Sequence, residues 1–228
     1  MSLISRRQLL SRLASAGLVA AVTPLRSAFA APPPPAPAAP RAAHLSDQEG
    51  AELRQVQDYL NNIRTLSSRF TQVTPDGRLS RGQFYLSRPG QMRIDYDPPV
   101  PVLLVADGSG NIYYYDRELQ QVTDVRANDT PAGFLLRDRI TLGGDITITS
   151  FQHHPGAIRV GLMETKEPGR GSVTIVLDDK PLQLRQWTVV DPQRKEVTVT
   201  LDNPHYGATI DPKLFYWTDP RPSNSTGK

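Results

Sequence analysis

The side chains that could do chemistry in this 228-residue chain form few of the groupings that catalysis or metal binding requires. His153 and His154 are adjacent, and adjacent residues of a strand point to opposite faces, so together they supply at most half of a metal site. Asp178 and Asp179 precede a Lys-Pro pair and are typical of a hairpin turn rather than an acid–base pair. The sequence has no cysteine, no Gly-x-Ser-x-Gly elbow and no phosphate-binding glycine loop. These patterns argue against an enzyme, a metal site and a cofactor.

Arg88 is the charged residue whose position is hardest to explain. It lies in the stretch YLSRPGQMRIDYDPP (85–99), which is typical of two short strands joined at a Pro-Gly turn. Period-two alternation places Arg88 on the same face as Phe84 and Leu86. Burying a guanidinium group is costly without acceptors, so a buried Arg88 needs hydrogen-bond partners from another part of the chain. The alternative is that Arg88 lies at the rim of the sheet and points into water.

The register of these two strands follows from their apolar faces. A two-residue loop would set the two apolar faces on opposite sides of the hairpin, whereas an odd-numbered loop such as 89–91 sets them on the same side. The odd loop is therefore preferred, and it places Arg88 on the inward side. It predicts three cross-strand pairs: Arg88 with Met92, Leu86 with Ile94, and Phe84 with Tyr96.

One amphipathic helix is predicted near the start of the folded part. Ser46 followed by Glu49 is the capping-box pattern that begins a helix. Apolar residues then recur at helical spacing and form a single stripe. These residues are Leu53, Val56, Leu60, Ile63 and Leu66.

From residue 70 onward the chain changes to short alternating runs separated by Gly, Pro, Asp and Asn. The predicted strands are residues 68–74, 82–88, 92–97, 100–106, 111–116, 119–124, 146–151, 157–164, 172–178, 182–190, 195–201 and 214–217. Such consecutive hairpins form an antiparallel meander, and a sheet of so many strands must curl or close. The stretch TPAGFLL (130–136) interrupts the meander and predicts a short apolar helix, capped by Thr130 or Asp129 and with Pro131 in its first turn.

Apolar and aromatic side chains cover much of this sheet, including the run 112–115. A small barrel is filled by its own side chains or holds a ligand, and periodicity does not separate the two cases. Composition alone leaves both interpretations open.

The first 30 residues have the layout of a secretory signal peptide. They hold Arg6, Arg7, Arg12 and Arg26 and no acidic residue, and small residues precede a cleavage site expected after Ala30. The SRR motif favours a twin-arginine signal, with an ordinary secretory signal as the alternative. The rest of the chain holds 22 of the 26 basic residues against 23 acidic ones, and this near-neutral balance argues against nucleic-acid binding. We expect a soluble, exported protein, since no later stretch approaches the roughly 20 apolar residues of a membrane span.

Four segments are expected along the chain. Residues 1–30 form the signal peptide, and 31–45 form a proline- and alanine-rich linker, of which 31–40 is expected in polyproline conformation. Residues 46–220 form one folded domain, and 221–228 form a flexible tail.

The order and spacing of several motifs resemble the outer-membrane lipoprotein carrier protein (LolA) family. The motifs are RGQFYLSRPGQMRIDYDPP, LVADG, IYYYDRELQQVT, TPAGFLL, LQLRQWTVVD and IDPKLFYW. The first helix also runs into FTQ as in that family. The resemblance covers about residues 50–220.

The resemblance implies a mainly β fold, an incomplete antiparallel barrel whose apolar concave face is lidded by helices. It implies a monomeric periplasmic carrier that shelters acyl chains. Such a carrier takes acylated lipoproteins from an inner-membrane lipoprotein-releasing ABC transporter and passes them to an outer-membrane receptor or the outer membrane.

The resemblance also implies roles for single residues. In that family the arginine of the Arg-Pro pair hydrogen-bonds to the lid and helps control its opening, a role that falls here on Arg88. The lid is then TPAGFLL with part of the first helix. The expected cavity-lining residues are Leu60, Ile63, Phe70, Phe84, Leu86, Met92, Ile94, Tyr96, Phe134 and Leu135.

Two other functions compete with the carrier. A lipid or lipoprotein sensor of the same fold is the main alternative, and a periplasmic esterase is weaker because the nucleophile elbow is absent. The outer-membrane receptor has a related fold but is lipid-anchored through a cysteine, so the lack of cysteine favours the carrier over the receptor.

Overall fold

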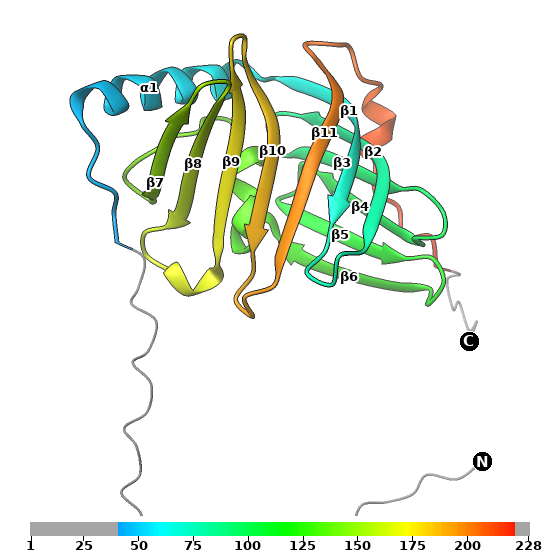
Figure 1. Ribbon diagram of the computed structural model, residues 1–228. Coiled ribbons are helices and arrows are strands. Elements are labelled where there is room, and N and C mark those ends of the chain that lie inside the picture. The colour runs from blue at the N-terminus through cyan, green and yellow to red at the C-terminus, as the bar shows by residue number, and fades with distance from the viewer. Residues whose placement is uncertain (1–40, 222–228) are drawn as a thin grey trace, which may run out of the picture. The chain divides into compact units, whose positions relative to one another are not determined.

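The computed structural model describes residues 41–221, which form an eleven-stranded antiparallel sheet and one α-helix (Figure 1). The predicted signal peptide (1–30), most of the linker and most of the C-terminal tail lie outside the described residues. The strands are β1 (Thr65–Val73), β2 (Leu79–Ser87), β3 (Gln91–Tyr96), β4 (Val102–Asp107), β5 (Asn111–Asp116), β6 (Gln121–Arg126), β7 (Ile146–His154), β8 (Ala157–Glu164), β9 (Ser172–Asp179), β10 (Leu182–Val190) and β11 (Glu196–Tyr206).

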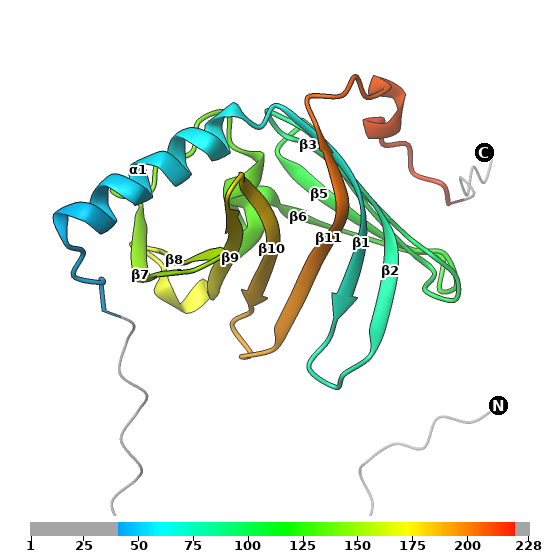
Figure 2. The same ribbon diagram turned by 45° about the horizontal axis from the view of Figure 1, so that its top comes forward.

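The strand order is β6-β5-β4-β3-β2-β1-β11-β10-β9-β8-β7. Each ladder therefore joins two strands that are neighbours in the sequence, except the ladder between β1 and β11. The sheet curls around a concave side but stays open, because β6 and β7 are its two edges (Figure 2). The predicted mainly β fold, an incomplete antiparallel barrel, is confirmed.

Irregular pairing accompanies the curl. The register shifts in three ladders, and such bulges bend a strand and increase its twist. The shifts lie at Ser67/Arg69, Ile148/Ser150 and Leu184/Gln186. Along β2 the side chains alternate as predicted, with Phe84 and Leu86 buried and their neighbours half-exposed.

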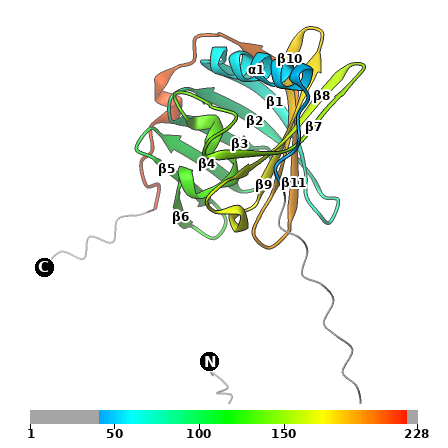
Figure 3. The ribbon, with the colours of Figure 1, turned by 90° about the vertical axis from the view of Figure 1, so that its left-hand side faces the viewer.

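Helix α1 (Asp47–Asn62) begins at the predicted capping box. The Ser46 hydroxyl accepts a hydrogen bond from the Glu49 backbone N–H, while the Glu49 carboxylate accepts one from the Ser46 backbone N–H at 2.8 Å. The apolar stripe of the helix packs on the concave side of the sheet and is buried at Leu53, Val56 and Leu60. Figure 3 shows α1 lying across one end of the curled sheet.

A connection of two short 3₁₀ helices joins the edge strands β6 and β7. These are η1 (Ala127–Asp129) and η2 (Pro131–Leu136), and we refer to residues 127–138 as the lid segment. A helix was predicted for 130–136, and it is a 3₁₀ helix with i→i+3 hydrogen bonds such as that from the Gly133 N–H to the Thr130 carbonyl oxygen at 3.0 Å. Thr130 begins η2 without a side-chain cap; its hydroxyl instead donates to the Ala127 carbonyl oxygen at 2.8 Å.

The register predicted for β2 and β3 is wrong by two residues. Leu86 pairs with Met92, Phe84 with Ile94 and Gly82 with Tyr96. The loop has an odd number of residues, as predicted, but it consists of residues 88–90, so Arg88 leaves the ladder. The apolar faces agree with either odd loop, and the hydrogen bond from the Gly90 N–H to the Leu136 carbonyl oxygen (2.8 Å) favours the observed one.

The strand predicted at 214–217 is also wrong. Residues Pro212–Phe215 form a 3₁₀ helix, η4, which the Asp211 side chain caps by accepting from the Lys213 N–H. Phe215 is buried, and Trp217 stacks on Tyr113 of β5 with ring centroids 4.8 Å apart. This segment therefore covers the convex side of the sheet rather than adding a strand to it.

Two residues that precede α1 contact the sheet. The Ala43 N–H donates to the Ile148 carbonyl oxygen on the edge strand β7 at 2.8 Å, and Leu45 packs against the core. In the part of the chain that the structure describes, none of the helices is long and apolar enough to cross a membrane.

Candidate functional site

The concave face of β2–β6 holds an open apolar cavity of about 470 Å³. Apolar and aromatic side chains from five neighbouring strands form most of its wall, and the lid segment and β10 close one side. The lining residues are Phe84, Met92, Ile94, Leu104, Ile112, Tyr114, Thr123, Val125, Thr130, Leu135 and Trp187.

Leu135 of the lid segment divides the interior into two parts. Together with Phe84 and Trp187 it lines the open cavity on one side and a second, nearly filled cavity of about 10 Å³ on the other. The rings of Phe84 and Trp187 lie 5.4 Å apart between their centroids. The filled part lies under α1, so movement of the lid segment would join the two parts into one larger apolar space.

The ten residues that the sequence analysis expected to line a cavity fall into separate groups. Phe84, Met92, Ile94 and Leu135 line the open cavity, and Leu60, Ile63 and Leu86 line the small one beside Phe84 and Leu135. The other three lie elsewhere. Phe134 lines a third cavity, Tyr96 lines an open groove near the β3–β4 turn, and Phe70 is buried against Tyr96 with ring centroids 5.3 Å apart.

Sequence reasoning missed Trp187 and several residues of β4–β6. Ile112 and Tyr114 carried a signal in the aromatic run 112–115, and alternation places them on the concave face. Trp187 carried none, because it reaches the cavity from the far half of the sheet.

Arg88 lies at the end of β2 with its side chain buried, only 7% exposed. Its guanidinium donates to four backbone carbonyl oxygens. The acceptors are Arg137 (2.8 Å) and Asp138 (3.0 Å) in the lid segment, and Leu60 (2.6 Å) and Ile63 (3.2 Å) at the end of α1. Burial lowers the pKa of Arg88, and the nearby positive charge of Arg64 lowers it further. One side chain thus joins β2, the lid segment and α1.

Side chains of α1 hold the chain that follows the lid segment. Asn61 donates to the Ile140 carbonyl oxygen and accepts from the Ile140 N–H, both at 2.8 Å. Gln57 accepts from the Leu142 N–H at 2.8 Å. These two amides were not singled out from the sequence, because polar residues on a helix are ordinarily read as solvated.

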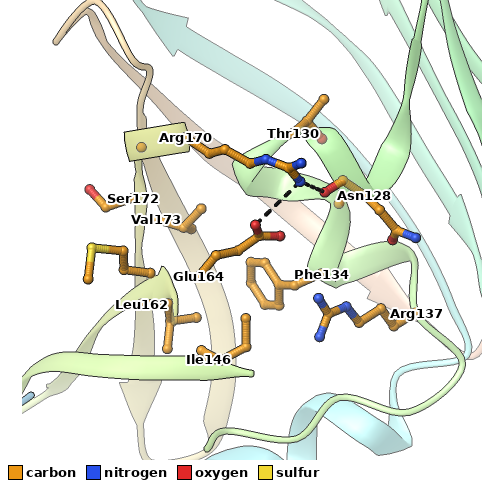
Figure 4. Close-up of a pocket in the computed structure, with 13 residues that line it drawn as sticks. Asn128, Thr130, Phe134, Arg137, Ile146, Leu162, Glu164, Arg170, Ser172 and Val173 are labelled. Atoms are coloured by element: carbon orange, nitrogen blue, oxygen red, sulfur yellow. Dashed lines mark hydrogen bonds and ion pairs between the residues drawn. The ribbon is translucent and has the colours of Figure 1, made fainter. Parts of the chain in front are cut away.

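Arg170 holds the other end of the lid segment (Figure 4). It belongs to η3 (Pro168–Arg170), in the connection between β8 and β9. Its Nη1 donates to the Asn128 carbonyl oxygen at 3.0 Å and lies 3.2 Å from the Asp129 carboxylate. The carboxylates of Glu164 and Glu167 also contact its guanidinium. The sequence offered no signal for this cluster.

A cavity of about 20 Å³ lies beside this cluster, with Phe134 reaching into it from η2. Ile146, Leu162 and Val173 form the apolar part of its wall. The lid segment is therefore seated by Phe134 on one side and by Leu135 on the other.

His153 contacts carboxylates rather than a metal set. Its Nδ1 lies 2.9 Å from the Glu52 carboxylate on α1, and its Nε2 lies 3.6 Å from that of Asp179. Among residues 41–221, no group of three or more His, Cys, Asp or Glu side chains is arranged to hold a metal ion. The interior is apolar, so the arrangement fits the holding of an apolar molecule.

Comparison with known proteins matches residues 61–218 to the family model of the outer membrane lipoprotein carrier protein LolA. The chain belongs to the LolA family. A protein of Methylococcus capsulatus named outer-membrane lipoprotein carrier protein is 32% identical over 77% of this chain and 87% of its own length. The protein of that name from Pseudomonas aeruginosa is 36% identical over 47% of this chain and 54% of its own length.

A solved structure of a LolA superfamily protein from Nitrosomonas europaea is 8% identical to this chain. It aligns over 72% of this chain and 97% of its own length, with a TM-score of 0.41. Family membership here rests on the sequence matches.

Proposed function

We propose that this protein is a periplasmic carrier that shelters the acyl chains of lipoproteins in its concave face and moves them between membranes. The observation that carries the proposal is the open apolar cavity of about 470 Å³ in a chain of the LolA family. The relatives named outer-membrane lipoprotein carrier protein support the same role.

The physics of carriage fits an apolar interior. Exposing acyl chain to water costs about 0.8 kcal/mol per CH₂, so one chain of roughly 16 carbons costs on the order of 10 kcal/mol to move unsheltered. The cavity wall removes most of that cost. The inner-membrane donor is a lipoprotein-releasing ABC transporter, and the acceptor is an outer-membrane receptor or the membrane itself.

In this proposal Arg88 acts as a latch that holds the lid segment closed. Its bonds to Arg137, Asp138, Leu60 and Ile63 stabilise the closed, empty state, in which Leu135 divides the interior. Cargo that opens the lid segment must break them, and re-forming them favours release. The latch thereby keeps binding weak enough for the acceptor to take the cargo downhill.

Mass spectrometry of the protein purified from the periplasm tests carriage directly. We expect triacylated or diacylated lipoprotein, or lipid derived from it, to co-purify. Recovery of lipid without transfer to acceptor membranes would favour a sensor over a carrier. Purified protein free of any lipid, and unable to take up lipoprotein from donor membranes, would contradict both.

Arg88→Leu tests the latch. The fold should persist, because replacing a buried charge by an apolar residue is often neutral. Loss of charge-assisted hydrogen bonds of about 1.5 to 3 kcal/mol each should favour the open state, so cargo loads but is released poorly. Arg88→Lys should be intermediate, since an ammonium group lacks the planar fork.

The assay scores lipoprotein bound in one step and lipoprotein delivered to receptor-bearing membranes in the next. Arg78→Leu is the matched control, because it removes an exposed ion pair with Asp76 in the β1–β2 turn and leaves the contacts of Arg88 and the lid segment in place. Delivery by Arg88→Leu at the parent level would refute the latch.

A further inference from the structure

The two ends of the lid segment are held by different arginines from different parts of the sheet. Arg88, in the β2–β3 loop, binds the carbonyl oxygens of Arg137 and Asp138 at the C-terminal end. Arg170, in the β8–β9 connection, binds the carbonyl oxygen of Asn128 and the carboxylate of Asp129 at the N-terminal end. The lid segment is thus attached to the rest of the protein at each of its two ends.

The two attachments differ in chemistry. All four hydrogen bonds of Arg88 go to neutral backbone oxygens in a buried site. Arg170 is partly exposed and contacts three carboxylates: Asp129 on the lid segment and Glu164 and Glu167 on the β8–β9 side. Removing this one guanidinium would leave like charges facing each other across the joint, whereas removing that of Arg88 leaves only carbonyl dipoles.

An apolar side chain supports the attachment on the Arg170 side. Phe134 sits in a cavity of only about 20 Å³ against Ile146, Leu162 and Val173, on the same side as Arg170. Leu135 also lines the nearly filled cavity of about 10 Å³ together with Arg88, and the open cavity of about 470 Å³ borders both Leu135 and Thr130. Phe134 therefore adds an apolar contact to the attachment on the Arg170 side.

We propose that Arg170 is a positioning residue that keeps the N-terminal end of the lid segment on the β8–β9 connection while the Arg88 end opens. The lid segment then swings about η1 instead of detaching, and Leu135 returns to the same place after each release. This inference rests on the proposed function, in which the lid segment opens to admit acyl chains.

Hydrogen exchange of the mature protein, read by mass spectrometry, tests the two ends separately. The N-terminal reporters are the N–H groups of Thr130 and Gly133, which bond to Ala127 and Thr130. The C-terminal reporter is the Gly90 N–H, which bonds to Leu136. Arg170→Gln should speed exchange of the N-terminal reporters by about tenfold or more and leave the Gly90 N–H near the parent rate.

Arg88→Leu should do the reverse, with fast exchange at Gly90 and parent rates at Thr130 and Gly133. Arg78→Gln is the matched control, since it removes an exposed arginine pair with Asp76 in the β1–β2 turn. Parent rates at the N-terminal reporters in Arg170→Gln would overturn the proposal. Equal acceleration at both ends in either variant would overturn it too, because the lid segment would then open as one unit.

Charge rescue separates the proposed role from a general loss of packing. Asp129→Asn in the Arg170→Gln background removes the lid-side carboxylate, so it should slow the N-terminal reporters back toward the parent rate. Raising salt from about 0.01 M to 1 M should speed these reporters in the parent protein and leave Gly90 unaffected. If exchange of the N-terminal reporters stays fast in the double variant, the charges around Arg170 do not hold the N-terminal end of the lid segment.

These readouts do not need cargo, so the two proposals fail separately. A parent protein that takes up no lipoprotein would defeat the proposed function, while the exchange rates still report how the lid segment moves. If the parent protein carries lipoprotein and Arg170→Gln exchanges like the parent at both ends, only the proposed role of Arg170 is refuted.

Discussion

Arg88 shows how far one side chain can be interpreted from its neighbours in the sequence. Alternation along β2 put it on the apolar face, and the cost of burying a guanidinium required acceptors from elsewhere. The structure places carbonyl oxygens of Leu60, Ile63, Arg137 and Asp138 around it. Those partners could not be identified by physical reasoning from the sequence, since they lie more than 20 residues away on both sides. The partners of Arg170 on the lid segment, Asn128 and Asp129, were hidden for the same reason.

Tyr96 gives a prediction about alkaline stability. Burial raises its pKa to about 12, and the neighbouring Tyr114 adds to the effect. Above the ordinary tyrosine pKa of about 10 the unfolded chain loses this proton while the folded protein keeps it. The stabilisation from this group is therefore complete below pH 10 and is lost as the pH rises toward 12.

Tyr96→Phe should remove this pH dependence, at most about 2 to 3 kcal/mol between pH 10 and 12. The measurement is the free energy of unfolding in urea at several pH values, each referred to the same protein at pH 8. Burial also raises the pKa of Tyr206, so the Tyr96→Phe variant should still lose part of its free energy of unfolding at alkaline pH. If the free energy of unfolding of Tyr96→Phe falls with pH as steeply as that of the parent, Tyr96 is not the group responsible.

The strands were the most predictable elements. Strands such as β2 alternate between a buried face and a more exposed one, and this period of two can be read in the sequence. Residues 214–217 have the apolar and aromatic composition of a strand: Leu214, Phe215, Tyr216 and Trp217. Phe215 is buried and Trp217 stacks on Tyr113 on the convex face, while Tyr216 is exposed.

The lid segment has a close approach that no periodicity reveals. A Cβ added at Gly133 would collide with the Ala127 carbonyl oxygen, because η1 and η2 fold tightly on each other. Gly133→Ala should lower the free energy of unfolding by about 1 to 3 kcal/mol and loosen the lid segment. Urea unfolding and uptake of a fluorescent fatty acid measure the two effects.

Gly169→Ala is the control for that change. Gly169 lies in η3, and a Cβ there meets no atom within 4 Å. Its stability should stay within about 0.5 kcal/mol of the parent, as for most surface substitutions. If both variants unfold alike, the close contact at Gly133 is not what limits the lid segment.

At the scale of the whole molecule, the basic residues of the leader set one prediction. Residues 1–30 carry four arginines and no acidic residue, so we expect export and cleavage after Ala30. The mature protein should begin at Ala31, as N-terminal sequencing of periplasmic material would show. Mature protein that retains Arg6 and Arg7 would contradict this expectation.

Replacing Arg6 and Arg7 by lysine separates the export routes. Precursor should accumulate in the cytoplasm if the twin-arginine route is used. Unchanged export would point to the ordinary secretory route. Immunoblots of cytoplasmic and periplasmic fractions distinguish the two.

The β1–β11 ladder is the one pairing in the described sheet between strands that are not neighbours in the sequence. Every other ladder joins neighbours in the sequence, so β1–β6 and β7–β11 can each form from local hairpins. The β1–β11 ladder joins residues such as Phe70 and Leu201, and closing so long a loop is the slow part of folding a β protein. Trp187 and Phe84 come from opposite sides of that seam, so their contact forms only after it closes. The contribution of β10 to the cavity wall is therefore completed last, when β11 pairs with β1, whereas the part formed by β2–β6 can form earlier.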